Sequence, residues 1–240
     1  MITLGIDLSA QRAGTAACLI DWQREKVVVS EPQVGCSDAE LDEVIGRADA
    51  VGIDAPFGWP KPFIDAVASW TLKEWSPEIR DRLQFRATDR FVRDMQRRWP
   101  LSVSTDKIAL PAMRAMALLN RHGVTDRSGD GLFFEIYPAA SLHAWGISNR
   151  GYKQAKDEAC VAARAKILTE LRVRLPQLEL PSSAAATSDT LDSLIASLTT
   201  RAAAIGRARR PGSELIELAR TEGSIHVPIG PMAEDLAAEA

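Results

Sequence analysis

The sequence predicts an α/β fold in which a mixed β-sheet is flanked by helices. Three short apolar segments with tight connections, residues 2–8, 15–20 and 26–30, open the chain in the pattern of an antiparallel meander. A helical pattern and a further apolar run, Ala50 to Asp54, come next, so that strands and helices alternate as in α/β proteins. The chain has 240 residues, 46% of them hydrophobic, which is enough for one domain with a substantial core.

Capping residues, prolines and hydrophobic periodicity predict the other elements. Ser37 is expected to cap a helix that runs to about Arg47, because acidic residues follow it in the first turns. Pro56 and Gly58 are expected to end the strand that precedes them. The later predicted elements are a strand over 132–137, a short helix through Trp145, a helix from about Lys153 to Arg174, a loop over 175–186, a helix from Asp189 to about Ile205 with one apolar face, and an extended segment over 225–229.

Residues 59–131 differ in character from the rest of the chain. The segment reads as helical, contains several prolines and holds four of the six tryptophans. Residues 61–130 contain 13 Lys and Arg against 9 Asp and Glu, a net charge of +4 in a chain whose net charge is −3. We predict a single domain over 1–240 with a lid-like helical insertion, 59–131, between its fourth and fifth strands. Its tryptophans are interpreted as a small core of the insertion, and the alternative is that this basic segment contacts a phosphate-bearing ligand.

The bulk composition limits the partners and the compartment. A net charge of −3 and a pI near 5.7 indicate that any contact with nucleic acid is local. The three cysteines lack metal-ligand spacing and are interpreted as reduced, buried thiols. We recognise neither a signal peptide nor a run of about 20 apolar residues, so we expect a cytoplasmic protein with no membrane contact. The oligomeric state is left open.

Acidic residues adjoin several of the predicted core segments. Asp7, Asp54 and Glu135 lie at or near the ends of strands, and Asp189 and Asp192 share one face at the start of a helix. Carboxylates among apolar residues cost free energy unless they hold a proton or a cation, and ligands of open α/β sheets bind outside the carboxyl ends of strands. Carboxylate oxygens suit Mg²⁺ or Mn²⁺, ions that neutralise charge when a phosphodiester is hydrolysed. The pattern therefore favours a metal-dependent enzyme of phosphate chemistry.

Several of these residues also have a structural interpretation. Asp54 precedes Ala-Pro and would suit a turn, whereas Asp189 could be an ordinary N-cap with Asp192 favouring the helix dipole. Arg86 is a candidate to clamp a substrate phosphate, but Asp89 lies one helical turn away and an intrahelical ion pair is the alternative. Lys153 is a second candidate for substrate binding, with a solvated helix start as its alternative.

Five short motifs, taken in order, resemble one protein family. They are Gly5-Ile6-Asp7 with Gly14-Thr15, Ile53-Asp54-Ala55-Pro56-Phe57-Gly58, Glu135-Ile136-Tyr137-Pro138, Asp189-Thr-Leu-Asp192-Ser-Leu, and Glu222-Gly223-Ser224-Ile225-His226-Val227-Pro228. The family is the predicted nuclease family with a ribonuclease H fold that is catalogued as domain of unknown function 429, and the likeness spans nearly the whole chain.

The resemblance implies a ribonuclease H-like fold and a divalent-metal-dependent nuclease that acts on DNA, RNA or a small nucleotide. The wider pattern is similar to the RuvC resolvases, which carry an Asp on the first strand, an acid on the fourth and D-x-x-D at the start of the last helix. By that similarity Asp7 would be the central ligand of Mg²⁺ or Mn²⁺, and Asp54, Asp189 and Asp192 would be the other ligands. Glu135 matches the E-x-Y-P motif of the family and is expected to be catalytic.

Two rival functions stay open. The run from Gly5 to Ser9, followed by Gly14-Thr15, resembles the first phosphate loop of sugar kinases and actin-like ATPases, although no second glycine-rich nucleotide loop is recognised. The other rival is a non-catalytic module that binds nucleic acid or another ligand, in which the acids serve only caps and turns. Stabilisation by ATP would favour the first rival, and the lack of any metal effect would favour the second.

Overall fold

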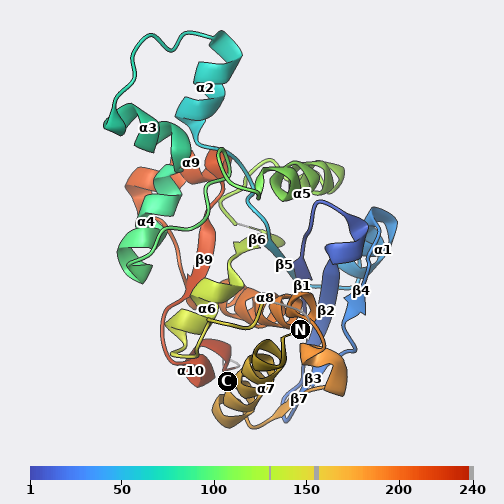
Figure 1. Ribbon diagram of the computed structural model, residues 1–240. Helices are drawn as coiled ribbons and strands as arrows, with labels where there is room; N and C mark the ends of the chain where they lie inside the picture. Colours follow the sequence, from blue (N-terminus) through green and yellow to red (C-terminus); the bar gives the residue numbers. More distant parts are fainter. Residues whose placement is uncertain (130, 154–156, 238–240) are drawn as a thin grey trace.

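The computed structural model contains a nine-stranded mixed sheet with helices on both of its faces (Figure 1). It describes residues 1–129, 131–153 and 157–237. The strands are β1 (Ile2–Asp7), β2 (Ala16–Trp22), β3 (Val27–Val29), β4 (Gln33–Val34), β5 (Ala50–Asp54), β6 (Phe133–Ile136), β7 (Leu178–Glu179), β8 (Ala208–Arg209) and β9 (Ile225–Pro228). Their order is β7-β3-β2-β1-β5-β6-β9-β8, and β4 pairs with β2 beside this path.

The sheet joins an antiparallel meander to a parallel half. β1, β2 and β3 pair in antiparallel fashion, whereas β1, β5, β6 and β9 run parallel to their neighbours. Parallel neighbours need long crossovers, which the helices supply. The helices are α1 (Asp38–Ile45), α2 (Lys61–Ser69), α3 (Pro77–Gln84), α4 (Ala87–Gln96), α5 (Ala109–Arg121), α6 (Pro138–Ala144), α7 (Glu158–Arg174), α8 (Ser188–Ala204), α9 (Ser213–Glu222) and α10 (Met232–Leu236). None of these described helices has both the length and the apolar character that a membrane crossing requires.

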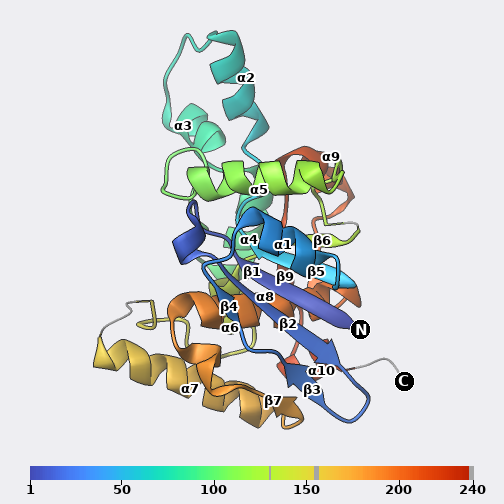
Figure 2. The same cartoon turned by 90° about the vertical axis from the view of Figure 1, so that its right-hand side faces the viewer.

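The central strand shows how one sequence serves two faces. Side chains alternate along a strand, so Leu4 and Ile6 point to one face and Gly5 and Asp7 to the other. Leu4 and Ile6 belong to the apolar cluster that includes Leu41 of α1 and other residues of α1 and α5. The opposite face packs against α8, which Figure 2 shows on the other side of the sheet from α1 and α5.

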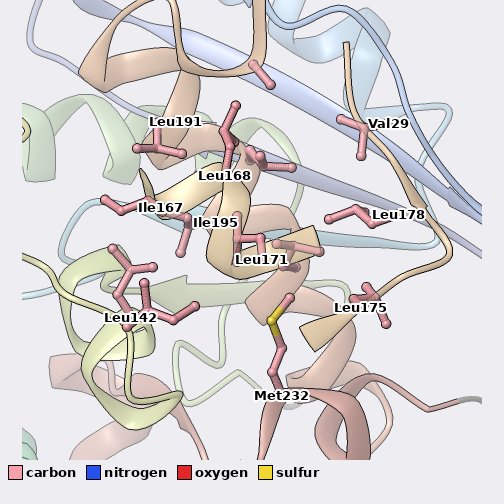
Figure 3. Packing of buried hydrophobic residues seen from close by; sticks show 14 of the residues in the cluster. Val29, Leu142, Ile167, Leu168, Leu171, Leu175, Leu178, Leu191, Ile195 and Met232 are labelled. Carbon is pink, nitrogen blue, oxygen red and sulfur yellow. The ribbon is translucent and has the colours of Figure 1, made fainter. Parts of the chain in front are cut away.

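Helix α8 lies in the centre of the molecule. Figure 3 shows Leu171 of α7, Ile195 of α8 and Val29 of β3 around one buried apolar cluster. The predicted apolar face is present, because Leu191, Leu194, Ile195, Leu198 and Ala202 share one cluster. The other faces of α8 are buried as well, from Thr190 to Ala203, which its sequence did not predict. The helix lies between the sheet and α6 and α7, and its polar residues face partners; the Ser197 hydroxyl, for example, donates to the Thr3 carbonyl oxygen at 3.0 Å.

Helices α2 to α5 lie between β5 and β6 in the chain, and α2 and α3 project away from the sheet in both views (Figures 1 and 2). Trp70 and Trp75 are 89% and 69% exposed. The interpretation of the tryptophans as a core of this segment is therefore wrong for these two. Trp99 does pack, because its ring stacks on Phe85 with the ring centroids 3.9 Å apart.

Most predicted elements are confirmed, but three strands of two residues and two helices were not predicted. Ser37 caps α1 in a capping box with Glu40, as its sequence indicated, and the extended segment near 225–229 is β9. Helix α7 begins at Glu158, later than the predicted Lys153, and residues 154–156 lie outside the described residues. β4, β7 and β8 have two residues each, and such strands are too short to show any periodicity. Helices α9 and α10 were also not predicted.

Candidate functional site

Strands β1 and β5 both end in the triplet Gly-Ile-Asp, residues 5–7 and 52–54. The two strands are parallel neighbours in a register that pairs Gly5 with Gly52 and Asp7 with Asp54. Because paired residues of parallel strands point to the same face, both aspartates lie side by side on the face that α8 covers. The sequence prediction that strand ends bring Asp7 and Asp54 together agrees with this register.

The two glycines let α8 approach the sheet closely. A Cβ atom on Gly5 would collide with the backbone of Ser193, and one on Gly52 would collide with the Thr200 hydroxyl. Any larger residue would hold the helix away from the strands. The close contact brings the first turns of α8, with Asp189 and Asp192, to the carboxyl end of β1.

Asp189 is not the N-cap of α8. Thr187 caps the helix in a capping box with Thr190, so the structural interpretation of Asp189 as an ordinary cap is wrong. Asp189 is partly buried and accepts a hydrogen bond of 3.0 Å from the Ser188 hydroxyl. Asp192 is fully buried, one turn further along the helix.

Tyr152 and Lys153 contact the Asp192 carboxylate from the loop that precedes α7. The Tyr152 hydroxyl donates to Asp192 Oδ1 at 2.8 Å, and the Lys153 ammonium donates to Oδ2 in an ion pair. Lys153 therefore lies before the helix rather than in its first turn. Its ammonium is a cation beside the aspartates. The sequence had offered Lys153 as a substrate-binding residue or as a solvated helix start, and neither alternative includes this position. Tyr152 was not predicted as a site residue.

The aspartates raise one another's pKa values. Burial raises the pKa of Asp7 well above its ordinary value, the charges of Asp54 and Asp192 add to the rise, and Lys153 acts against it. Burial also raises the pKa of Asp54 to about 7, where Lys153 opposes the rise and Asp192 adds to it. The pKa of Asp192 is raised by burial although Lys153 and Tyr152 act to lower it. Among the described residues, the Lys153 ammonium thus leaves the cluster with excess negative charge, which favours binding of protons or cations.

A pocket of about 560 Å³ opens over these residues. The pocket is within the size range of small-molecule sites. A larger cavity of about 830 Å³ lies between α2 and α3, but its lining contains no carboxylate. We therefore take the pocket over the aspartates as the candidate site. Its charged lining residues are Asp7, Asp54, Arg86, Arg98, Glu135, Lys153 and Asp189.

Glu135 also lines this pocket, but its carboxylate is already paired. In the register of β5 and β6, Glu135 pairs with Ile53 and so points to the face opposite Asp54. There Arg86 donates to both carboxylate oxygens, at 2.6 and 2.8 Å, and the Phe57 amide donates at 3.0 Å. The structure thus brings Asp7 and Asp54 together and joins Glu135 to a separate network.

The Arg86 guanidinium is buried and shared between two acids. It also pairs with Asp89 at 2.7 Å, so the ion pair that the sequence offered as an alternative is present. Burial acts to lower the pKa of Arg86, but Asp89 and Glu135 outweigh this effect and raise the pKa well above its ordinary value. The role of Arg86 as a phosphate clamp stays a prediction, and in this structure its donors bind protein acceptors.

Glu222 completes the network and was missed as a functional candidate. Its carboxylate accepts the backbone N–H groups of Lys61 and Ala87, both at 2.8 Å, at the starts of α2 and α4. Its carbonyl oxygen accepts from Arg86 at 2.9 Å. The signal was available, since Glu222 opens the last of the five motifs. The network ties α2, α4 and α9 to the sheet beside the pocket.

The donor set of the pocket suits a hard divalent cation in its chemistry. Asp7, Asp54 and Asp189 line the pocket and the buried Asp192 lies beside them, so that together they supply carboxylate oxygens and excess negative charge. Within the described ranges, however, no three or more His, Cys, Asp or Glu side chains are close enough together to hold a metal ion. In the present arrangement the Lys153 ammonium binds Asp192 instead. The residues therefore fit such an ion by type and charge, while their spacing does not complete a coordination sphere.

Comparison with known proteins gives one match. Residues 5–215 match the model of the family described as "Protein of unknown function (DUF429)". No curated protein and no solved structure matches the chain.

Proposed function

The chain belongs to the DUF429 family, and on this premise we propose that it is a divalent-metal-dependent phosphodiesterase of the nuclease type with a ribonuclease H-like fold. The observation that carries the proposal is the direct pairing of Asp7 with Asp54 at two strand ends, beside Asp189 and Asp192 and under one pocket. Among the described residues, four carboxylates beside the Lys153 ammonium have more negative charge than a merely structural cluster needs.

The fold supports the proposal through the positions of these acids. An antiparallel meander opens the sheet, its first strand ends in Asp7, and the parallel neighbour of that strand ends in Asp54. The D-x-x-D pair lies in the first turns of α8. The RuvC resolvases, which the sequence resembles, carry an Asp on the first strand, an acid on the fourth and D-x-x-D at the start of the last helix. Here Asp54 lies on β5 and α9 and α10 follow α8, so the likeness rests on the first strand and on the order of the acids.

Each side chain has a distinct part in the proposed site. Asp7, Asp54, Asp189 and Asp192 would hold Mg²⁺ or Mn²⁺, and such an ion neutralises charge on phosphate oxygens when it is bound. Tyr152 holds Asp192 in its orientation through the 2.8 Å hydrogen bond. The Lys153 side chain is 58% exposed and lines the pocket, so its ammonium can also donate to an anionic group of a substrate.

The proposal is tested by metal binding and by cleavage. We expect Mn²⁺ and Mg²⁺ to raise the stability of the wild-type protein by about 2.7 kcal/mol at one hundred times Kd, and Asp7→Asn to abolish most of this rise. The measurement is thermal unfolding with and without each ion, followed by hydrolysis of a 4-nitrophenyl phosphodiester. Ser9→Ala is the control, because Ser9 also lines the pocket but carries no charge. Full metal stabilisation of Asp7→Asn would refute the assigned site.

A further inference from the structure

We propose that the pocket binds a small phosphate ester of about mononucleotide size rather than a polynucleotide. We propose further that the segment between α4 and α5 forms the wall that holds the ester's apolar group. This inference rests on the proposed function and names its class of substrate. Pro100, Leu101 and Ile108 of this segment, with Pro111 in the first turn of α5, supply the wall, and they line the same pocket as Asp7.

The wall is fixed in place by its own contacts. The Ser102 hydroxyl donates to the Gln84 carbonyl oxygen at 2.6 Å, which ties the segment to the end of α3. The Asp106 carboxylate accepts the Ser102 backbone N–H at 2.7 Å and closes the turn. On the other side of Pro100, Trp99 stacks on Phe85. A pocket whose wall is preformed in this way loses little entropy when it binds a ligand of matching size.

The size of the pocket limits the ligand. A volume of about 560 Å³ lies in the middle of the range for small-molecule sites, and a mononucleotide fits that range. The lining is chemically divided between carboxylates from β1, β5 and α8 and apolar side chains from the segment after α4. A phosphate would need Arg98, Lys153 or a cation held by the carboxylates to balance its charge, and the apolar side chains would hold the ligand's other group.

The charges around the pocket disfavour a long polyanion. Polynucleotide binding depends on many Lys and Arg side chains, each of which neutralises a backbone phosphate. The described residues of the lining include three cationic side chains, Arg86, Arg98 and Lys153. Arg86 is buried between two carboxylates, and Lys153 pairs with Asp192. Arg98 is exposed, and with Lys153 it can serve one or two phosphate groups rather than a backbone.

The experiment compares ligands and wall variants by binding. Thymidine 5′-monophosphate, a monoester that the proposed reaction would not consume, is titrated into the protein by calorimetry in the presence of Mg²⁺. A longer single-stranded oligonucleotide and a duplex serve as competitors. We expect the mononucleotide to bind one to one, with a log–log salt slope of roughly one or two, and the longer strands to bind no more tightly.

Leu101→Asn tests the wall, and Leu110→Asn is its matched control. Both leucines are exposed, 57% and 61%, but Leu110 does not line the pocket. We expect Leu101→Asn to weaken mononucleotide binding about tenfold and Leu110→Asn to change it less than about twofold. Thermal unfolding of both variants checks that they remain folded.

The outcomes separate this inference from the proposed function. The inference is overturned if the oligonucleotide binds much more tightly than the mononucleotide with a steep salt dependence, if the mononucleotide does not bind, or if both leucine variants behave alike. Mononucleotide binding that depends on Leu101, without hydrolysis of any phosphodiester, would support the small-ligand pocket and refute the phosphodiesterase. Cleavage of long strands without mononucleotide binding would support the phosphodiesterase and refute the small-ligand pocket.

Discussion

The pocket borders two groups of acids, buried Glu135 and the partly buried Asp7 and Asp54, that differ in how their charge is compensated. Glu135 receives two guanidinium hydrogen bonds and a backbone N–H, so its negative charge is paired within the protein. Asp7 and Asp54 lie on the opposite face of the sheet, where burial and the charge of Asp54 raise the pKa of Asp7, and burial and the charge of Asp192 raise the pKa of Asp54. This difference separates Glu135, which helps to hold the fold together, from Asp7 and Asp54, which are available for a ligand. Removing the partner of Glu135 should therefore destabilise the protein. Removing the charge of Asp7 or Asp54 should stabilise it.

The largest effect is expected at Arg86. Arg86→Met would leave the Glu135 and Asp89 carboxylates buried without their partner, and we expect a loss of roughly 3–5 kcal/mol in the free energy of unfolding. Urea denaturation measures the change. Arg90→Met is the matched control in the same helix, because its pair with Asp81 is partly exposed and should contribute about 1 kcal/mol or less. Equal losses in the two variants would show that the Arg86 network contributes no more to stability than a partly exposed ion pair.

The next effect is expected at Asp54 and has the opposite sign. The pKa of its carboxyl in the folded protein is raised to about 7. The folded state therefore binds the proton more tightly than the unfolded state, and this contribution to stability is fully present at low pH. This stability is lost as the pH rises from the unfolded pKa near 4 through the folded pKa. The asparagine side chain that Asp54→Asn introduces does not ionise, so the variant does not lose stability as the pH rises. We expect Asp54→Asn to be roughly 2–4 kcal/mol more stable than wild type at pH 8 in metal-free buffer. Urea denaturation from pH 4 to pH 8 should show a flatter dependence for the variant. A variant less stable than wild type at pH 8 would contradict this account.

The sequence was sufficient to select Asp7 and Asp54, but not to separate Glu135 from them. The repeated Gly-Ile-Asp triplets carry both the acid and the glycine that lets α8 approach, and strand ends in one sheet meet at one edge. The face to which Glu135 points depends on the register of β6 against β5, and a shift of one residue would reverse it. Alternation within four residues does not fix that register.

Long-range partners were the other part that the sequence did not contain. Arg86 and Asp89 are three residues apart and their pairing was one of the alternatives, whereas Glu135 is 49 residues from Arg86. The pairing of Lys153 with Asp192 spans 39 residues and depends on how the loop before α7 packs on α8. Local periodicity predicts an element and its buried face, but the contacts between such distant loops follow from tertiary packing.

The smallest effect is expected at Lys153, which is an ion-pair partner like Arg86 but lies beside the aspartates of the pocket. Its ammonium compensates Asp192, but the Lys153 side chain is 58% exposed, so Lys153→Met should cost roughly 1–2 kcal/mol in metal-free buffer, less than a fully buried pair. Because the substitution frees a carboxylate among Asp7, Asp54 and Asp189, we also expect Mn²⁺ to stabilise the variant more than it stabilises wild type. Thermal unfolding across a Mn²⁺ titration measures both effects. Lys26→Met is the control, since the Lys26–Glu179 pair lies on the surface and away from the pocket. If Mn²⁺ acted equally on wild type and Lys153→Met, the ammonium and the cation would not compete, and Lys153 would belong with Arg86 among the structural partners.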